Sequence, residues 1–206
     1  MNTFLSDNVR ETMCKLCEEH IRDSGLFTSP LCEGAYCDEA YKYYLECLKE
    51  QNIEPITVVF TDIDGVLIKD NHQRVKMVDG FPPFSKSCVT AYNELIRLTG
   101  AKTVISSDWR KWEDLESLKM IFSNRCVDCD IISMTDILSY QISSCASRGQ
   151  EIANWLERHP EVTNYVILDD IIDTIKSKHP DNYIECDENI GLTEELMRKA
   201  LEILKS

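Results

Sequence analysis

The sequence ITVVFTDIDGV, residues 56–66, decides the fold. Its first part is a continuous apolar run that ends in Asp62, which is typical of a strand buried in a parallel sheet. Asp64 follows two positions later, and Gly65 then supplies the backbone freedom that a tight turn needs. The stretch therefore predicts a buried strand that presents two carboxylates at its carboxyl end.

Apolar runs alternate with helical patterns over the chain that follows. Further strands are predicted at 102–107, 129–134, 164–170 and 181–187. Amphipathic helices are predicted at 83–100, 112–124, 148–159 and 192–206. Gly100 should end the first of these helices, and Thr193 should cap the last. Repeated strand–helix units build a parallel sheet with helices on both faces, so we predict a Rossmann-like α/β fold of three layers, α/β/α.

A change of pattern near residues 51–56 predicts a boundary within the chain. Residues 1–52 show the spacing of two helices, and we expect an N-terminal α-hairpin that is too small for a sizeable core of its own. Residues 53–206 carry the alternating strands and helices and are predicted to form the larger domain.

Two close cysteine pairs lie in the expected hairpin, Cys14 with Cys17 and Cys32 with Cys37. Four thiolates at such spacing can hold tetrahedral Zn²⁺, which would also help to order a small hairpin. Cys14 and Cys17 also fall on one helix face, where free thiols pack as small hydrophobic side chains. The spacing leaves both the zinc site and simple packing open.

The composition argues against several functional classes. The 206 residues include 22 basic and 36 acidic side chains, for a net charge of −14, so we expect no large non-specific nucleic-acid surface. No apolar run approaches the ~20 residues that a membrane helix needs, and the polar N-terminus does not resemble a signal peptide. Ten cysteines are too few for a disulfide scaffold. We expect a cytoplasmic protein with no membrane partner.

Acidic and hydroxyl side chains follow three of the predicted strands, at the edge where parallel sheets bind ligands. They are Asp62 and Asp64, then Ser106 and Ser107, and finally Asp169, Asp170 and Asp173. Converging carboxylates repel one another unless a cation lies among them, and their hard oxygen atoms favour Mg²⁺. One aspartate of the first pair can act as a nucleophile while the other serves as acid and base.

These features together resemble the haloacid dehalogenase (HAD) superfamily of phosphohydrolases, over roughly residues 56–206. The sequence DIDGV (62–66) is similar to the first motif of that superfamily, and Ser106 stands where the second motif has a Ser or Thr. Arg148 opens a predicted helix, as the basic residue of the third motif does. The acid pair 169–170 is similar to the fourth motif, which completes a metal site.

A narrower resemblance bears on the substrate. The segments SSDWR (106–110), RGQEIANWL (148–156) and YVILDDIID (165–173) are similar to the small HAD domains of the Swiss Army Knife RNA-repair group. That group is inferred to act as phosphatases on nucleic-acid ends. The short connections after Asp64 and within 125–147 leave no room for a large cap domain, and an open site suits a large substrate.

The resemblance implies a mechanism. Asp62 would attack phosphorus to form an aspartyl-phosphate, and Asp64 would protonate the leaving oxygen and then activate a water. Mg²⁺ would be held by Asp62, by the backbone carbonyl of Asp64, and by Asp169 or Asp170. Asp173 would act on the metal through a water molecule.

Several polar residues are candidates for binding the phosphoryl group. The resemblance assigns this role to Ser106, with Ser107 beside it, and to Arg148. A cation is unfavourable in the first turn of a helix, so Arg148 at that position would itself indicate a bound anion. Arg110 follows the second strand and could form a bidentate phosphate contact, with a solvated surface position as the alternative.

Three functions remain open from the sequence. The leading hypothesis is a Mg²⁺-dependent phosphatase whose partner is a phosphorylated nucleic-acid end or nucleotide. The second is a phosphatase of small metabolites, with the N-terminal hairpin covering the site. The third is a non-catalytic HAD-fold adaptor or binding module, against which the intact acidic motifs argue.

Two features of the structure can distinguish these hypotheses. A basic rim around the strand ends would favour a nucleic-acid substrate, and its candidates are Lys69, Arg74, Lys76, Arg110, Lys111 and Arg148. The three tryptophans, Trp109, Trp112 and Trp155, are expected in the core, but an exposed Trp109 or Trp112 beside the site would favour base stacking.

Overall fold

The structure is a computed structural model that describes residues 54–70, 76–138 and 144–205, together with residues 46 and 49. The expected N-terminal hairpin and its four cysteines, Cys14, Cys17, Cys32 and Cys37, lie outside the described residues. Within the described part of the chain, no helix is long and apolar enough to cross a membrane.

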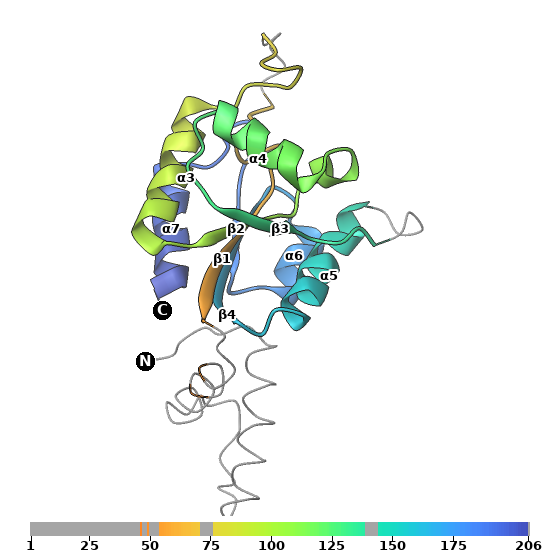
Figure 1. Cartoon of the computed structure of the whole chain (residues 1–206), viewed down its shortest axis with the longest axis vertical. Coiled ribbons are helices and arrows are strands. Elements are labelled where there is room, and N and C mark those ends of the chain that lie inside the picture. Colours follow the sequence, from red (N-terminus) through yellow and green to blue (C-terminus); the bar gives the residue numbers. More distant parts are fainter. Residues whose placement is uncertain (1–45, 47–48, 50–53, 71–75, 139–143, 206) are drawn as a thin grey trace, which may run out of the picture.

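The described residues form one parallel sheet of five strands (Figure 1). In chain order the strands are β1 (Ile56–Thr61), β2 (Lys102–Ile105), β3 (Ile131–Met134), β4 (Val162–Asp169) and β5 (Tyr183–Glu185). Their order across the sheet is β3-β2-β1-β4-β5, and all four pairings are parallel. The predicted strands and the Rossmann-like α/β class are confirmed, and β1 is the central strand.

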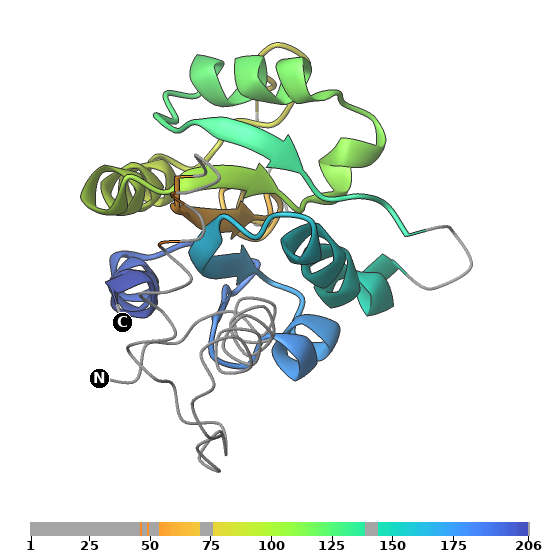
Figure 2. The ribbon, with the colours of Figure 1, turned by 60° about the horizontal axis from the view of Figure 1, so that its bottom comes forward.

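Helices cover both faces of the sheet and form the outer layers (Figure 2). One face packs against α3 (Lys86–Thr99), α4 (Leu115–Asn124) and α7 (Glu194–Lys205). The opposite face packs against α5 (Ser144–Glu157) and α6 (Asp173–Lys178). The three layers are those predicted from the alternation of strands and helices.

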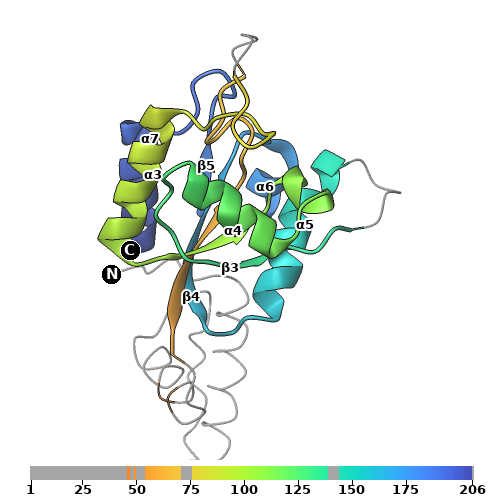
Figure 3. The same ribbon diagram turned by 45° about the horizontal axis from the view of Figure 1, so that its top comes forward.

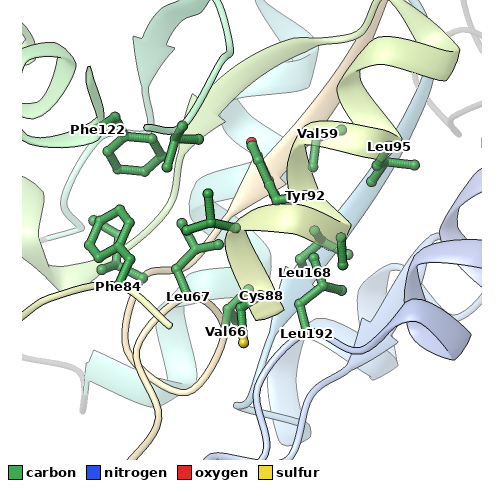
Figure 4. Close-up of a cluster of buried hydrophobic side chains, with 14 of the residues drawn as sticks. Val59, Val66, Leu67, Phe84, Cys88, Tyr92, Leu95, Phe122, Leu168 and Leu192 are labelled. Carbon is green, nitrogen blue, oxygen red and sulfur yellow. The ribbon is translucent and has the colours of Figure 1, made fainter. Parts of the chain in front are cut away.

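Successive side chains of β1 enter two separate hydrophobic clusters, which explains its unbroken apolar sequence. Val59 points to the cluster under α3, with Tyr92 and Leu95 (Figure 4). Val58 and Phe60 point to the cluster under α5. All of these side chains are fully buried, so that shortening Leu95 to Ala should cost about 2–5 kcal/mol of folding free energy.

The predicted helix signals at Gly100 and Thr193 are confirmed. Gly100 takes a left-handed conformation with φ of 64° after α3, and its N–H donates to Ile96 O. Thr193 Oγ1 accepts a hydrogen bond from Leu196 N at 3.2 Å at the start of α7. Local sequence therefore fixes these two helix ends.

Three details differ from the predictions. A 3₁₀ helix, η1 (Asp108–Lys111), follows β2 and was not predicted, because a single turn shows no hydrophobic period. The short helix α6 was missed for the same reason. Helix α5 begins at Ser144, so Arg148 lies in its second turn and not in its first.

Little additional structure separates β1 from α3. In the described part of residues 62–85, the only β-pairings are isolated bridges between Asp64 and Ile68 and between Val78 and Phe81. The described connections therefore contain no cap domain, in agreement with the minimal or uncapped fold that was predicted. This connection, drawn orange to yellow in Figure 3, follows β1, and the loop before α7 contacts it, since Leu192 N–H donates to Val66 O at 2.9 Å.

Candidate active site

The register of the central strands brings distant residues together at one edge of the sheet. Thr61 pairs with Ile105 of β2 on one side and with Leu168 of β4 on the other. The Asp62 N–H donates to Leu168 O at 3.0 Å, and Ser106 N–H donates to Thr61 O at 3.1 Å. The next residues, Asp62, Ser106 and Asp169, therefore lie side by side at the carboxyl edge, where the strand order reverses.

Three carboxylates gather at this point. Asp62, Asp169 and Asp170 each offer an oxygen, and these oxygens lie within 4.8 Å of one another. Asp62 and Asp169 are buried, and Asp170 is half-buried. Backbone amides orient two of them, since Ile63 N–H donates to Asp62 Oδ1 at 2.8 Å and Ile171 N–H donates to Asp169 Oδ1 at 2.9 Å.

Burial and mutual repulsion make these carboxylates hard to ionise together. Burial raises the pKa of Asp169 above its usual range, and the charge of Asp62 raises it further. The same two causes raise the pKa of Asp170 to about 6. The negative charge of the three carboxylates is therefore not fully balanced, and a bound cation would reduce their mutual repulsion.

The donor set fits Mg²⁺. Carboxylate oxygens on a rigid sheet edge are the hard ligands that this ion prefers. Gly65, with φ of +70°, leaves space for one of them, because a Cβ on Gly65 would lie 2.6 Å from Cγ of Asp170. The side chain of Asp64 is not part of the cluster, and that of Asp173 lies outside the described side chains, so its proposed metal role stays a prediction.

Arg148 supplies positive charge to the cluster from α5. Its Nη1 lies 2.7 Å from Asp169 Oδ2 and 3.3 Å from Asp62 Oδ2, and its Nη2 lies 3.1 Å from Asp108 Oδ1. Burial alone would lower the pKa of Arg148, but the carboxylates of Asp169 and Asp62 raise it, so the guanidinium stays charged.

The second-turn position of Arg148 corrects one argument from the sequence. The positive end of the helix dipole acts mainly on the first turn, so it does not strongly disfavour a cation in the second turn. The position of Arg148 along α5 therefore does not by itself indicate a bound anion. What points to an electrostatic role is instead its burial among carboxylates from three segments of the chain.

The two serines after β2 have different environments. Ser107 caps η1, since its Oγ accepts a hydrogen bond from Trp109 N at 3.4 Å. Ser106 Oγ is fully buried and, among the described residues, has no hydrogen-bond partner. A buried hydroxyl without a partner is costly, which makes Ser106 the better candidate for a ligand contact.

Arg110 is buried in η1, and protein groups occupy most of its hydrogen-bond donors. Its guanidinium is buried, donates to the backbone carbonyls of Ser106 and Ser107, and forms an ion pair with Glu151 of α5. These contacts tie the loop after β2 to the helix that carries Arg148. The alternative of a solvated surface residue is wrong. Both Nη atoms are engaged in these contacts, whereas Nε has no hydrogen-bond partner among the described residues. The predicted phosphate contact of Arg110 therefore stays a prediction.

Asp64 projects from the turn after β1 and is held by a tryptophan. The indole N–H of Trp109 donates to Asp64 Oδ2 at 2.8 Å. Partial burial raises the pKa of Asp64, which the indole hydrogen bond opposes. Asp64 is exposed to solvent, as a proton donor to an incoming substrate needs to be.

The three tryptophans have three different environments. Trp155 lies in the core against Phe60, as predicted. Trp109 is 9% exposed and packs against Phe81, but its polar edge reaches the site. Trp112 is 74% exposed, which contradicts the expectation that it lies in the core.

Sequence reasoning gave no role to two residues that shape the site, Asp108 and Glu151. Asp108 binds Arg148 and Lys111, and Glu151 binds Arg110. The signal for Glu151 was its spacing, since it lies three residues after Arg148 and so on the same side of α5. Nothing local in the sequence indicated Asp108.

Comparison with known proteins agrees with this geometry. The family model described as "HAD domain in Swiss Army Knife RNA repair proteins" matches residues 58–197. That span begins within β1 and ends within α7, and so includes every strand end described above. No curated protein and no solved structure matches the chain significantly.

Proposed function

The chain belongs to the family of HAD domains found in Swiss Army Knife RNA repair proteins, a HAD-type phosphohydrolase family, and we propose that it is a Mg²⁺-dependent phosphatase that acts through an aspartyl-phosphate. One observation carries the proposal. Asp62, Asp169 and Asp170 bring their oxygens within 4.8 Å of one another, beside the hydroxyl of Ser106, which has no hydrogen-bond partner in the described part of the chain. A metal site next to an available phosphate ligand is what phosphoryl transfer requires.

In the proposed first step an oxygen of Asp62 attacks phosphorus. The bond between phosphorus and the leaving oxygen breaks, and Asp64 gives its proton to that oxygen. In the second step Asp64 takes a proton from a water, which attacks phosphorus and releases phosphate and the free Asp62 carboxylate. The exposure of Asp64 and the burial of Asp62 support this division of roles.

Mg²⁺ would be held by Asp62, Asp169 and Asp170, with the backbone carbonyl of Asp64 as a further ligand and Asp173 acting through water. When bound, it would neutralise negative charge on the phosphoryl oxygens and on the acid cluster. Arg148 would share that charge compensation, and the Ser106 hydroxyl would donate to a phosphoryl oxygen. In this proposal Ser107 and Arg110 support the loop after β2.

We propose a terminal phosphate on a nucleic acid as the substrate, in a cytoplasmic setting. The family name refers to RNA repair, and Trp112 offers an exposed aromatic face directly after η1. Stacking of a base on such a face contributes about 1–3 kcal/mol. The net charge of −14 favours contact with one strand end over binding along a strand.

The candidate residues for a basic rim around the strand ends support a nucleic-acid substrate less well than Trp112 does. Arg110 and Arg148 are buried, and Lys111 binds Asp108 at 2.8 Å. Lys76 is exposed, whereas Arg74 lies outside the described residues. A small metabolite is therefore the second candidate substrate, and a non-catalytic adaptor is the outcome if no turnover is found.

Hydrolysis of an aryl phosphate with and without Mg²⁺ tests the reaction. We expect metal-dependent turnover that falls by at least about 10³-fold in Asp62→Asn. Asp130→Asn is the matched control, because Asp130 is exposed and pairs with Lys102 at the opposite edge of the sheet. Equal activity in Asp62→Asn and the control would contradict the proposal, and absence of both turnover and Mg²⁺ binding would favour the adaptor.

Substrate class is tested by Trp112→Ala. We expect KM for a phosphorylated oligonucleotide to rise about 5- to 150-fold, while KM for a small alkyl phosphate stays unchanged. Met120→Ala is the control, since Met120 is also an exposed hydrophobic residue. An unchanged KM for the oligonucleotide would favour the metabolite.

A further inference from the structure

Trp109 connects the proposed acid–base group to the hydrophobic packing around the site. Its indole N–H donates to Asp64 Oδ2 at 2.8 Å, across 45 positions of sequence. Asp64 itself lies in a turn, and its carboxylate accepts no other side-chain hydrogen bond from the described residues. The direction of this carboxylate therefore depends on where the indole is held.

Packing holds the indole in place. Its ring lies 5.3 Å from that of Phe81 at an interplanar angle of 31°, and 6.5 Å from that of Phe84, edge to face. Phe81 and Phe84 belong to the connection after β1, whereas Trp109 belongs to η1 after β2. The connection after β1 therefore packs against the indole, whose N–H reaches the carboxylate of Asp64.

We propose that Trp109 is a positioning residue that fixes the carboxyl group of Asp64 for proton transfer to the leaving oxygen. This inference rests on the proposed function and adds a residue to it. A carboxyl group on a turn has several rotamers, and proton transfer needs the one within hydrogen-bond reach of the leaving group. One neutral donor at 2.8 Å selects a rotamer without adding charge to the site.

The position of the hydrogen bond explains why a tryptophan stands there. The indole bears a single donor at the far end of a large apolar ring, so it can be packed as core and still reach a carboxylate. Phenylalanine would keep most of the packing and lose only the donor. The variant Trp109→Phe therefore isolates the hydrogen bond.

The test compares two substrates that differ in their need for an acid. The leaving group of para-nitrophenyl phosphate is stable as an anion, whereas that of benzyl phosphate needs a proton. We expect Trp109→Phe to lower kcat/KM for benzyl phosphate by about 10-fold or more, and that for para-nitrophenyl phosphate by less than about 3-fold. The constant kcat/KM reports the first chemical step and is not affected by later hydrolysis of the intermediate.

Trp155→Phe is the matched control. Trp155 is buried, and its indole N–H donates to Ser133 Oγ at 3.0 Å in the cluster under α5. Replacing Trp155 by Phe removes an indole hydrogen bond of the same kind and leaves the hydrogen bond of Asp64 intact. We expect this variant to change kcat/KM for the two substrates by the same factor.

A double variant separates positioning from folding. In the Asp64→Asn background no acid remains to be positioned, so adding Trp109→Phe should lower kcat/KM for benzyl phosphate by less than about 2-fold. Equal losses of kcat/KM on both substrates, or additive losses in the double variant, would overturn the positioning role of Trp109. The proposed phosphatase function would not be affected by either result. Absence of turnover by the wild type on either substrate would contradict the proposed function, and this inference with it.

Discussion

The carboxylate of Asp170 lies directly against the backbone of Gly65, on the neighbouring strand end. A Cβ on Gly65 would stand 2.6 Å from Cγ and 2.8 Å from Cβ of Asp170, closer than any real contact. Gly65 is therefore needed for this close approach as well as for the turn after β1. It allows the carboxylate of Asp170, the residue after β4, to reach the acid cluster around Asp62.

This contact predicts that Gly65→Ala weakens Mg²⁺ binding. The added methyl group must shift Asp170 within the cluster, and disturbing the support of a metal ligand typically costs about 10- to 100-fold in affinity. Isothermal titration calorimetry measures the change. Gly100→Ala is the control, because Gly100 has a similar φ of +64° and nothing within 4 Å of its added Cβ. An equal Mg²⁺ affinity in the two variants would contradict the role of Asp170.

Ser106→Ala should separate activity from stability. Its hydroxyl is buried and unpartnered among the described residues, so its removal should leave the free energy of unfolding unchanged or raise it by up to about 1 kcal/mol. The same change should lower kcat/KM for an aryl phosphate by about 10-fold or more, because a donor to the phosphoryl group is lost. Urea unfolding and steady-state kinetics of the one variant give both values. Full activity in Ser106→Ala would remove this residue from the site.

Much of the fold follows from local sequence. The apolar runs at 56–62 and 164–170 identify β1 and β4, and parallel pairing then requires that their acidic ends meet. The acid cluster could be predicted for this reason, without any knowledge of the exact register.

What could not be predicted depends on contacts between distant segments. Arg110 meets Glu151 across 41 positions, and Trp109 meets Asp64 across 45. No periodicity or short spacing in the sequence indicates that either pair is in contact. Arg110 was therefore interpreted as a phosphate ligand or a surface residue. Its burial beside a carboxylate follows only from how α5 lies against the loop after β2.

The ion pair of Arg110 with Glu151 should be important for folding. Both side chains are nearly inaccessible to solvent. Glu151→Gln removes the nearer counter-charge of a buried cation, leaves it with Asp108 at 3.8 Å, and should cost up to about 3–5 kcal/mol. The exposed pair of Arg198 with Glu194 is the control, and Glu194→Gln should cost less than about 1 kcal/mol. Urea unfolding measures both. Similar losses of unfolding free energy in the two variants would show that the buried pair stabilises the fold no more than an exposed pair does.

The acid cluster should make Mg²⁺ binding dependent on pH. Burial and the charge of Asp62 raise the pKa of Asp170 to about 6, so the metal-free protein loses stability as the pH rises from about 4 through 6 and this group ionises. Mg²⁺ would bind the ionised form of this carboxyl group. We therefore expect the Mg²⁺-induced increase in Tm to be small at pH 5 and larger at pH 8, as measured by thermal melts. An increase that is equal at the two pH values, or larger at pH 5, would contradict this reasoning.

Chemical trapping is the most direct test that Asp62 carries the phosphoryl group. Asp64→Asn should still release the phenol of an aryl phosphate with a good leaving group, but it lacks the base that activates water for the second step. Acid quenching followed by borohydride reduction converts an aspartyl-phosphate to homoserine, which peptide mass spectrometry locates. We predict homoserine at position 62, only when substrate and Mg²⁺ are both present. Release of the phenol with position 62 unmodified, or with the modification at another residue, would contradict the account.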